Sequence, residues 1–171
     1  MVPRQVTVPS SSDTPPLDRA TLELARADIG FSAAHFSVLD GRAERLHGHN
    51  YRVILRVEGQ VGSDGTVIDF SALKSALRAE CAELDECVLL PTSGDAVRVT
   101  PQGDSVEVDE GDRHFVFPVT DVRLLPVPNT TCEWLAAWLL AQLRARLGKR
   151  TVRLTLTVEE LPGQGATVKE L

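Results

Sequence analysis

The strongest structural signal in this sequence is the alternation of residues 52–58, where Val53, Leu55 and Val57 are separated by mainly polar residues. Successive side chains of an extended backbone point to opposite faces, so this pattern predicts a strand with one apolar face. Residues 151–161 repeat the same alternation. A sheet built from such strands needs a second layer that covers its apolar face.

Two segments have the three- and four-residue spacing of apolar side chains that is typical of an amphipathic helix. The first helix is predicted over residues 70–84, with Asp69 as its N-cap and Phe70 in its apolar stripe. The second is predicted over residues 132–147, with Thr131 as its N-cap. Two helices that pack on a sheet place the chain in the α+β class.

A single domain over residues 20–171 is expected, because 171 residues with 43% hydrophobic content can form one core. Residues 1–19 contain four prolines and a serine run, which predicts a flexible N-terminal tail. Residues 20–36 favour one long strand that ends in a loop. Between about residues 94 and 118, short alternating runs separated by turn residues predict an inserted β-meander.

The overall charge argues against two classes of partner. A net charge of -6 and a pI near 5.2 do not favour binding to nucleic acid or to an anionic membrane, which both attract clustered Lys and Arg. No stretch approaches the roughly 20 apolar residues that span a bilayer. Three irregularly spaced cysteines fit a reducing compartment, so the sequence predicts a cytoplasmic protein.

Three of the four histidines lie close together in the sequence, at His35, His47 and His49. Residues two apart on a strand share a face, so His47 and His49 can offer two imidazoles to one ion, with His35 as the third ligand. Three nitrogen ligands leave tetrahedral zinc one open position, which is typical of a catalytic site that promotes proton abstraction beside a carbonyl. A His-x-His pair also occurs on surfaces by coincidence, and nickel and iron also accept imidazoles.

The histidines and their surroundings resemble a known family, the 6-pyruvoyl- and 6-carboxytetrahydropterin synthases with the tunnelling fold. The segments that carry the resemblance are residues 31–35, 46–51, 67–70, 84–85, 129–133 and 158–160. The resemblance implies an antiparallel sheet backed by two helices, and homotrimers whose strands close into a barrel, commonly stacked as hexamers. It also implies active sites between subunits and a small pterin-like substrate.

The resemblance also implies which residues bind the substrate. The family's pterin anchor falls on Glu160, and a carboxylate can accept two parallel hydrogen bonds from an amino-pyrimidinone edge. The threonine-rich helix start falls on Thr130 and Thr131. Two simpler interpretations stay open: Glu160 as a solvated residue near the end of a strand, and Thr131 as a helix cap alone.

The sequence departs from the family where the family's catalytic bases lie. The usual cysteine, four residues before His47, is replaced by Ala43, and the usual histidine after Asp85 is replaced by Glu86. A branch of the family has a glutamate three residues before His-Gly-His, at the position of Glu44 here. That branch is similar to enzymes that cleave the side chain of dihydroneopterin compounds. The candidate catalytic residues are therefore Glu44, Asp85 and Glu86.

Alternatives to these roles follow from the neighbouring residues. Glu44 lies between Arg42 and Arg45 and could form an ordinary surface ion pair. Cys87 and His114 could enter the pocket if their loops fold inward, although a small buried cysteine and a solvent-facing or strand-paired histidine are the simpler expectations.

Three functions remain after these observations. The leading one is a zinc-dependent lyase or cyclase that acts on a pterin-like carbonyl or polyol side chain. The second keeps the metal but uses it for a non-pterin aldol, addition or cyclisation reaction in secondary metabolism, because both usual bases are missing. The third is a non-catalytic oligomer that binds a metal or a ligand.

Overall fold

The computed structural model describes residues 16–148 and 150–170. Residues 1–15, which make up most of the predicted tail, lie outside the described residues. The first strand, β1 (Arg19–Leu24), begins one residue inside that predicted tail, because Arg19 already pairs with Gln60. The folded domain therefore starts earlier than the sequence pattern suggested.

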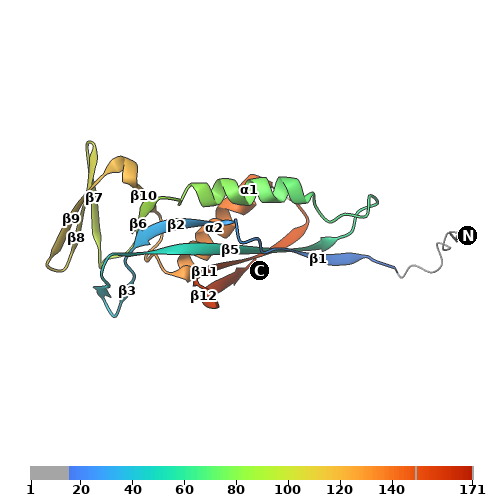
Figure 1. The fold of residues 1–171 in the computed structure, drawn as a ribbon, viewed down its shortest axis with the longest axis horizontal. Helices are drawn as coiled ribbons and strands as arrows, with labels where there is room; N and C mark the ends of the chain where they lie inside the picture. Colours follow the sequence, from blue (N-terminus) through green and yellow to red (C-terminus); the bar gives the residue numbers. More distant parts are fainter. Residues whose placement is uncertain (1–15, 149, 171) are drawn as a thin grey trace, which may run out of the picture.

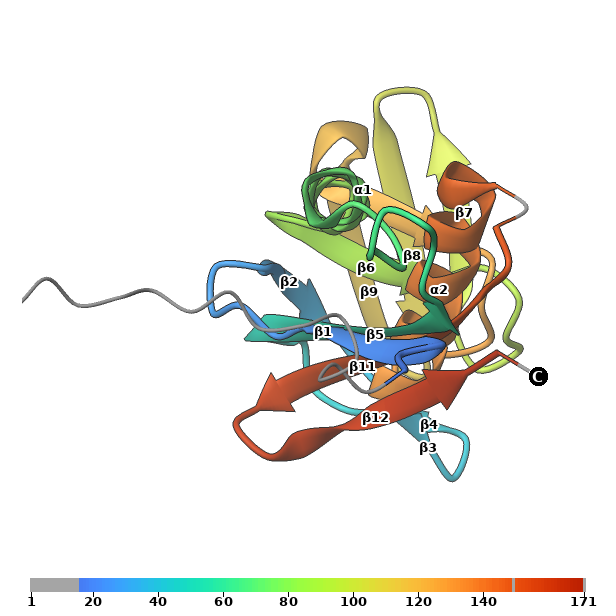
Figure 2. The same cartoon turned by 90° about the vertical axis from the view of Figure 1, so that its right-hand side faces the viewer.

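One large sheet carries the two helices on one of its faces (Figures 1 and 2). Its further strands are β2 (Gly30–His35), β5 (His47–Gln60), β6 (Cys87–Pro91), β10 (Val122–Leu125), β11 (Val152–Leu161) and β12 (Gln164–Lys169). Their order is β10-β6-β2-β5-β11-β12, and β1 also pairs with β5. β6 pairs in parallel with β2 and β10, and the other pairings are antiparallel. The α+β fold class is confirmed.

The prediction of one long strand over residues 20–36 was wrong. β1 and β2 both pair with β5, with Leu24 opposite Leu55 and Gly30 opposite Arg52. Residues 25–29 bulge out between the two strands, because five residues have only Val53 and Ile54 of β5 opposite them. The carbonyl of Ile29 still accepts a hydrogen bond from Val53 N at 3.1 Å, which rejoins the strand to the sheet.

Helix α1 (Phe70–Ala82) begins where the sequence predicts and ends two residues earlier. Asp69 caps it as expected, since its carboxylate accepts from the backbone N–H groups of Ser71 and Ala72. Phe70 does not belong to the buried stripe, because its side chain is 42% exposed. The first turn of the helix therefore leaves an aromatic ring on the surface.

Helix α2 (Cys132–Leu147) has the predicted bounds, and Gly148 ends it with a φ of 68°. Thr131 occupies the N-cap position without a side-chain hydrogen bond to the described helix backbone. Its hydroxyl instead interacts with Glu133 and lowers the pKa of that carboxyl group. Thr131 therefore occupies the N-cap position but does not cap the helix through its side chain.

The main core lies between the sheet and the two helices. Val53, Leu55 and Val57 of β5 are fully buried, which confirms the predicted apolar face. The helical side chains that cover the sheet with 0% exposure are Leu73, Leu77, Leu135, Ala136, Leu139 and Leu143. Each large aliphatic side chain buried in this way contributes roughly 1.5–3 kcal/mol.

The predicted meander is a separate three-stranded sheet formed by β7 (Arg98–Gln102), β8 (Ser105–Glu110) and β9 (Arg113–Pro118). A short 3-10 helix, η2 (Val119–Asp121), follows it. The meander has its own small core, which buries Phe36, Leu90, Val97, Val106 and Val108. Because Phe36 follows β2 directly, the meander packs beside the end of that strand (Figure 1).

Two small elements complete the chain. β3 (Val38–Leu39) and β4 (Arg42–Ala43) form a short hairpin between β2 and β5. β12 forms a second hairpin with β11, which extends the sheet beyond the predicted final strand. Across the described ranges, no helix combines the length and the apolar character needed to cross a membrane.

Candidate active site

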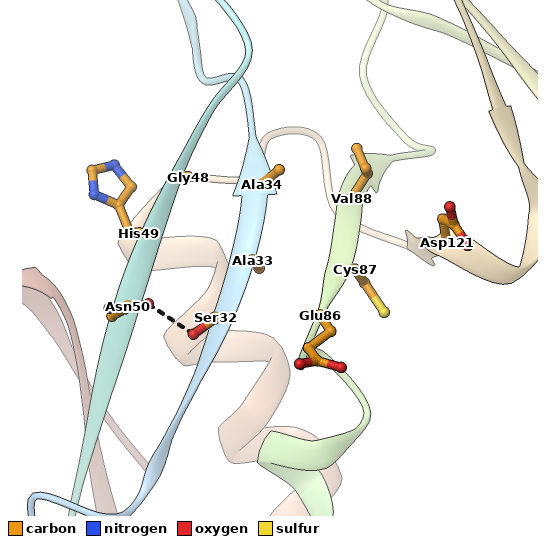
Figure 3. Close-up of a pocket in the computed structure, with 10 residues that line it drawn as sticks. All are labelled: Ser32, Ala33, Ala34, Gly48, His49, Asn50, Glu86, Cys87, Val88 and Asp121. Carbon is orange, nitrogen blue, oxygen red and sulfur yellow. Dashed lines mark hydrogen bonds between the residues drawn. The ribbon is translucent and has the colours of Figure 1, made fainter.

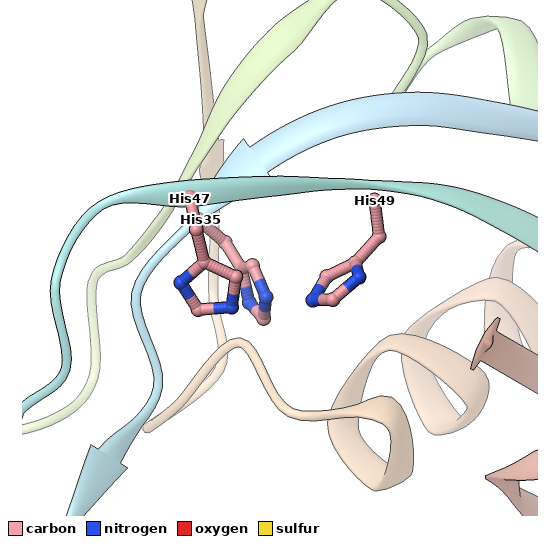
Figure 4. Close-up of side chains that lie close together, drawn as sticks. All are labelled: His35, His47 and His49. Atoms are coloured by element: carbon pink, nitrogen blue, oxygen red, sulfur yellow. The ribbon is translucent and has the colours of Figure 1, made fainter.

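The structure brings His35, His47 and His49 together at one place on the sheet. His35 ends β2 and lies opposite His47 of β5, and His49 follows two residues later on the same face. Figure 4 shows the three rings on the same side of the strands, above the segment that leads into α2. One ligand atom from each ring lies within 4.8 Å of the other two, so the three nitrogens are close enough to share one ion.

Backbone carbonyls orient two of the rings. Nδ1 of His35 lies 2.8 Å from the carbonyl oxygen of Thr130, and Nδ1 of His47 lies 2.7 Å from that of Arg45. A carbonyl can only accept a hydrogen bond, so each Nδ1 carries the proton and each Nε2 keeps its lone pair. This second contact is the usual way in which a protein orients a metal-binding histidine.

The charge state of His35 also suits a metal ligand. Burial lowers the pKa of its imidazole, which keeps the ring neutral near pH 7. Its Nε2 is buried and has no hydrogen-bond partner among the residues that the structure describes. A buried polar atom without a partner calls for an explanation, and coordination of a metal ion provides one here. The three residues therefore fit a zinc-type centre with nitrogen ligands.

A cavity of about 440 Å³ opens beside the imidazoles. Glu44, His47, His49, Thr131 and Glu160 all line it. The structure thus places two predicted carboxylates and one predicted threonine around the same cavity as two of the three candidate metal ligands.

Glu160 lies next to the imidazoles, with its Oε2 3.9 Å from Nε2 of His49. Its Oε1 accepts a hydrogen bond from Nε2 of Gln164 at 2.6 Å, and Sγ of Cys132 lies 3.6 Å from Oε2. The side chain is only 22% exposed. Its carboxylate is therefore fixed on the cavity wall by hydrogen bonding. The alternative of a freely solvated residue near the end of a strand does not describe it.

The two threonines have different surroundings. Thr130 is fully buried, and its hydroxyl donates to the carbonyl of Phe36 at 3.2 Å. Its contribution to the site is the backbone carbonyl that holds His35. Thr131 lines the cavity, and its hydroxyl interacts with Glu133, which lines the same cavity.

Glu44 follows β4 and lines the same cavity as His47. Its backbone N–H donates to the carbonyl of Ser37 at 2.8 Å, which closes the β3–β4 hairpin. Within the described part of the chain it forms no ion pair with Arg42 or Arg45. The alternative of a surface ion pair with these arginines is therefore not what the structure shows.

Asp85 and Glu86 lie elsewhere in the single chain. Asp85 accepts a hydrogen bond from Ser32 N at 2.7 Å, and Glu86 lines a second cavity of about 500 Å³. Figure 3 shows β2 between Glu86 and β5, the strand that carries His49. His49 also lines this second cavity, but Figure 3 shows its ring on the side of β5 that is turned away from β2 and Glu86. Neither Asp85 nor Glu86 lines the cavity beside the imidazoles in the described chain. Glu86 also adopts a φ of +56°, which is uncommon for a residue with a side chain.

The two other candidates for entry into the pocket stay outside the cavity beside the imidazoles. His114 is exposed on the meander, and its Nδ1 pairs with Oδ1 of Asp109 at 2.8 Å. This agrees with the simpler expectation of a histidine that faces solvent. Sγ of Cys87 donates to the carbonyl of Asp85 at 3.2 Å and lies at the second cavity. Within the described chain, neither residue joins Glu44 and Glu160 in lining the cavity beside the imidazoles.

Sequence reasoning missed several residues around the site. Cys132 lines the cavity, and burial together with the nearby Glu160 raises the pKa of its thiol to about 12. It therefore stays protonated at neutral pH and does not supply a thiolate base. Gln164 was missed because β12 was not predicted, whereas Cys132 could have been found from its place beside Thr131. Tyr51 was also missed: its hydroxyl is buried and has no partner among the described residues.

The fold and the site together define a tunnelling-fold protein with a candidate three-histidine metal centre. The family model for 6-pyruvoyl tetrahydropterin synthase matches residues 25–171. The chain belongs to this family, as the sequence resemblance predicted.

Individual relatives agree with this assignment. A protein of Methanocaldococcus jannaschii, provisionally named a 6-carboxy-5,6,7,8-tetrahydropterin synthase, is 30% identical over 149 residues, covering 84% of this chain and 91% of its own. The crystal structure of 6-pyruvoyl tetrahydropterin synthase from Plasmodium vivax is 34% identical, with a TM-score of 0.85 and coverage of 89% of this chain and 98% of its own. A variant structure of that enzyme, 33% identical with a TM-score of 0.82 and the same coverages, is described as having its catalytic glutamate changed to alanine.

Proposed function

We propose that this protein is a zinc-dependent lyase that removes part of the side chain of a dihydroneopterin-like pterin. The observation that carries the proposal is a group of three imidazoles, two of which, His47 and His49, line one cavity together with Glu44 and Glu160. Membership of the 6-pyruvoyl tetrahydropterin synthase family supports a pterin substrate. The names of the relatives support the same substrate class.

In this proposal His35, His47 and His49 hold the metal. A bound zinc ion would polarise a substrate oxygen and stabilise negative charge on it. The other residues of the site bind the substrate and transfer protons. Glu160 binds the amino-pyrimidinone edge of the pterin through charge-assisted hydrogen bonds, and Thr131 adds a hydroxyl on the same wall.

Glu44 is the proposed proton-transfer residue. Its carboxylate accepts the proton of a side-chain hydroxyl, and the carbon that bears this hydroxyl becomes a carbonyl as its carbon–carbon bond breaks. The carbon that stays attached to the pterin ring takes up the electrons of the broken bond, and Glu44 returns a proton to it. The family's cysteine position holds Ala43 here, so a carboxylate at the next residue is the nearest available base. The Plasmodium vivax relative with a catalytic glutamate supports this choice over a thiol.

The proposed active unit is a homo-oligomer, a trimer or a pair of stacked trimers, in which Asp85 and Glu86 serve the cavity of a neighbouring chain. Neither residue lines the cavity beside His47 and His49 in its own described chain, which supports this arrangement, because a role in proton transfer needs contact with the substrate. The three cysteines are free within the described ranges, which fits a reducing cytoplasm.

The direct test uses zinc-loaded protein and 7,8-dihydroneopterin, with the pterin products separated by chromatography. We expect turnover to 6-hydroxymethyl-dihydropterin by the unaltered chain. Glu44→Gln should lower kcat by about 10²–10⁴-fold, the usual contribution of general acid–base catalysis. Glu58→Gln, which alters a glutamate paired with Arg19 on the surface, is the matched control and should retain full activity. No turnover by the unaltered chain would contradict the proposal.

A second candidate function rests on the two replaced bases, Ala43 and Glu86. It keeps the metal and the fold but acts on a non-pterin carbonyl substrate through an aldol, addition or cyclisation reaction. A thermal-shift titration with neopterin separates the two. A ligand at about 100 times its Kd stabilises a protein by about 2.7 kcal/mol. A clear shift supports the pterin, and its absence favours the second function.

A further inference from the structure

We propose that Arg113 and Glu110 of the meander are positioning residues that hold the hairpin end from which Glu44 faces the cavity. The inference rests on the proposed role of Glu44 as the proton-transfer residue. It gives the inserted meander a part in the reaction, although no meander residue lines the cavity beside the imidazoles.

The contacts form a closed set around two consecutive residues. Nη2 of Arg113 donates to the backbone carbonyls of Ala43 at 2.7 Å and of Glu44 at 2.9 Å. Oε1 of Glu110 accepts from the backbone N–H of Ala43 at 3.0 Å. The two side chains also bond each other, because Nε of Arg113 donates to Oε2 of Glu110 at 2.6 Å. Both sides of the Ala43 backbone and the carbonyl of Glu44 are thereby fixed.

The surroundings of the pair make these contacts rigid. Glu110 is 8% exposed, and the hydrogen bond from Ala43 together with Arg113 lowers the pKa of its carboxyl group. A buried carboxylate depends on its donors, so losing one leaves an expensive unpaired charge. The guanidinium of Arg113 lies 5.9 Å from the centre of the Phe115 ring, which packs against the small meander core. The pair therefore links the meander core to the hairpin, so the hairpin is held in place relative to that core.

The other side of the hairpin is held from the segment before α2. Asn129 accepts from Val38 N at 3.0 Å and donates to the Val38 carbonyl at 2.8 Å. The start of the hairpin is thus tied to the residue that precedes Thr130, whose carbonyl orients His35. With Arg113 and Glu110 at its end, the hairpin is anchored on both sides, and Glu44 has a fixed position relative to the imidazoles.

The test compares Arg113→Ala and the milder Arg113→Lys. Lysine keeps the charge beside Glu110 but has one ammonium group in place of the two guanidinium nitrogens, of which Nε bonds Glu110 and Nη2 bonds the two carbonyls. His114→Ala on the same strand is the control, because His114 pairs with Asp109 in the solvent. We expect kcat to fall by roughly tenfold to a hundredfold in both Arg113 variants. KM and zinc content should stay the same, and hydrogen exchange of the amides of residues 43 and 44 should become faster.

A double-variant experiment separates positioning from general destabilisation. In a Glu44→Gln background, Arg113→Lys should lower kcat no further, because the group that it positions is already gone. An equal further loss in that background, or unchanged kcat and unchanged amide exchange in the single variants, would overturn the inference while the proposed function stands. Absence of turnover by the unaltered chain would instead overturn the proposed function and, with it, the role given to this pair.

Discussion

Nε2 of Gln164 lies 2.6 Å from Oε1 of Glu160, so the turn into β12 directs the carboxylate of β11. The other carboxylate oxygen faces Cys132 and His49 at 3.6 Å and 3.9 Å. Glu160 is thereby held between the hairpin and the imidazoles. This is the arrangement that a carboxylate needs if it is to bind a ligand beside a metal centre.

Glu160→Gln tests the ligand-binding role of this carboxylate. The variant keeps an oxygen that can accept from Gln164 but loses the charge, and hydrogen bonds to charged groups contribute about 1.5–3 kcal/mol. We expect the Kd for neopterin, measured by fluorescence titration, to rise by roughly tenfold or more with zinc content unchanged. The control is Glu159→Gln, because Glu159 pairs with Arg52 outside the cavity. Equal Kd values for both variants would rule out the anchor.

Glu86→Gly tests whether the carboxylate in the strained turn is there for function. Glycine adopts a φ of +56° without the steric clash of a Cβ atom, so the unfolding free energy should stay the same or rise by up to about 1 kcal/mol. We expect turnover to fall by at least about tenfold, because a proton-transfer group is removed. The two readouts are thermal unfolding and the product assay. A variant that is more stable and fully active would show that Glu86 has no part in the reaction.

The ion pair between Arg144 and Glu170 predicts a pH dependence of stability. The hydrogen bond from Arg144 lowers the pKa of Glu170 below its ordinary value of 4.5, and Leu154 N donates to the same carboxylate. A lowered folded-state pKa adds stability above the unfolded value, and this stability is lost as the pH falls through the folded-state value. We expect Glu170→Gln to destabilise by about 1–2 kcal/mol at pH 7.

That difference should shrink steadily as the pH falls below 4.5, where Glu170 becomes protonated in the unfolded and then in the folded chain. Urea unfolding of both proteins from pH 7 to pH 3 measures it. A difference that stays constant over this range would contradict the assigned ion pair.

The regular parts of the fold were predictable because local patterns determine them. Helix α2 was predicted with its bounds, since its apolar spacing stops at Gly148, which adopts a positive φ of 68°. The alternation in β5 was predicted correctly because one face of the strand is buried from Tyr51 to Gly59. The bulge at residues 25–29 was missed, because it depends on how many residues of β5 lie opposite, which no local pattern encodes.

The site was predictable where its members are close in the sequence or match a family motif. His47 and His49 share a face because of their spacing, and His35 reaches them through the register of β2 with β5. The roles of Arg113 and Glu110 could not be found in this way. They reach Ala43 across about 70 residues through the packing of the meander, and their hydrogen bonds go to backbone atoms, which leave no signature in the residue types.

The most direct test of the account is the metal content of the purified chain, measured by mass spectrometry of the elements together with the protein concentration. The account predicts one zinc ion per chain, lost in His35→Ala, His47→Ala and His49→Ala and retained in His114→Ala, the variant of the fourth histidine. A chain without stoichiometric metal, or equal metal content in all four variants, would contradict the shared metal centre on which the proposed chemistry depends.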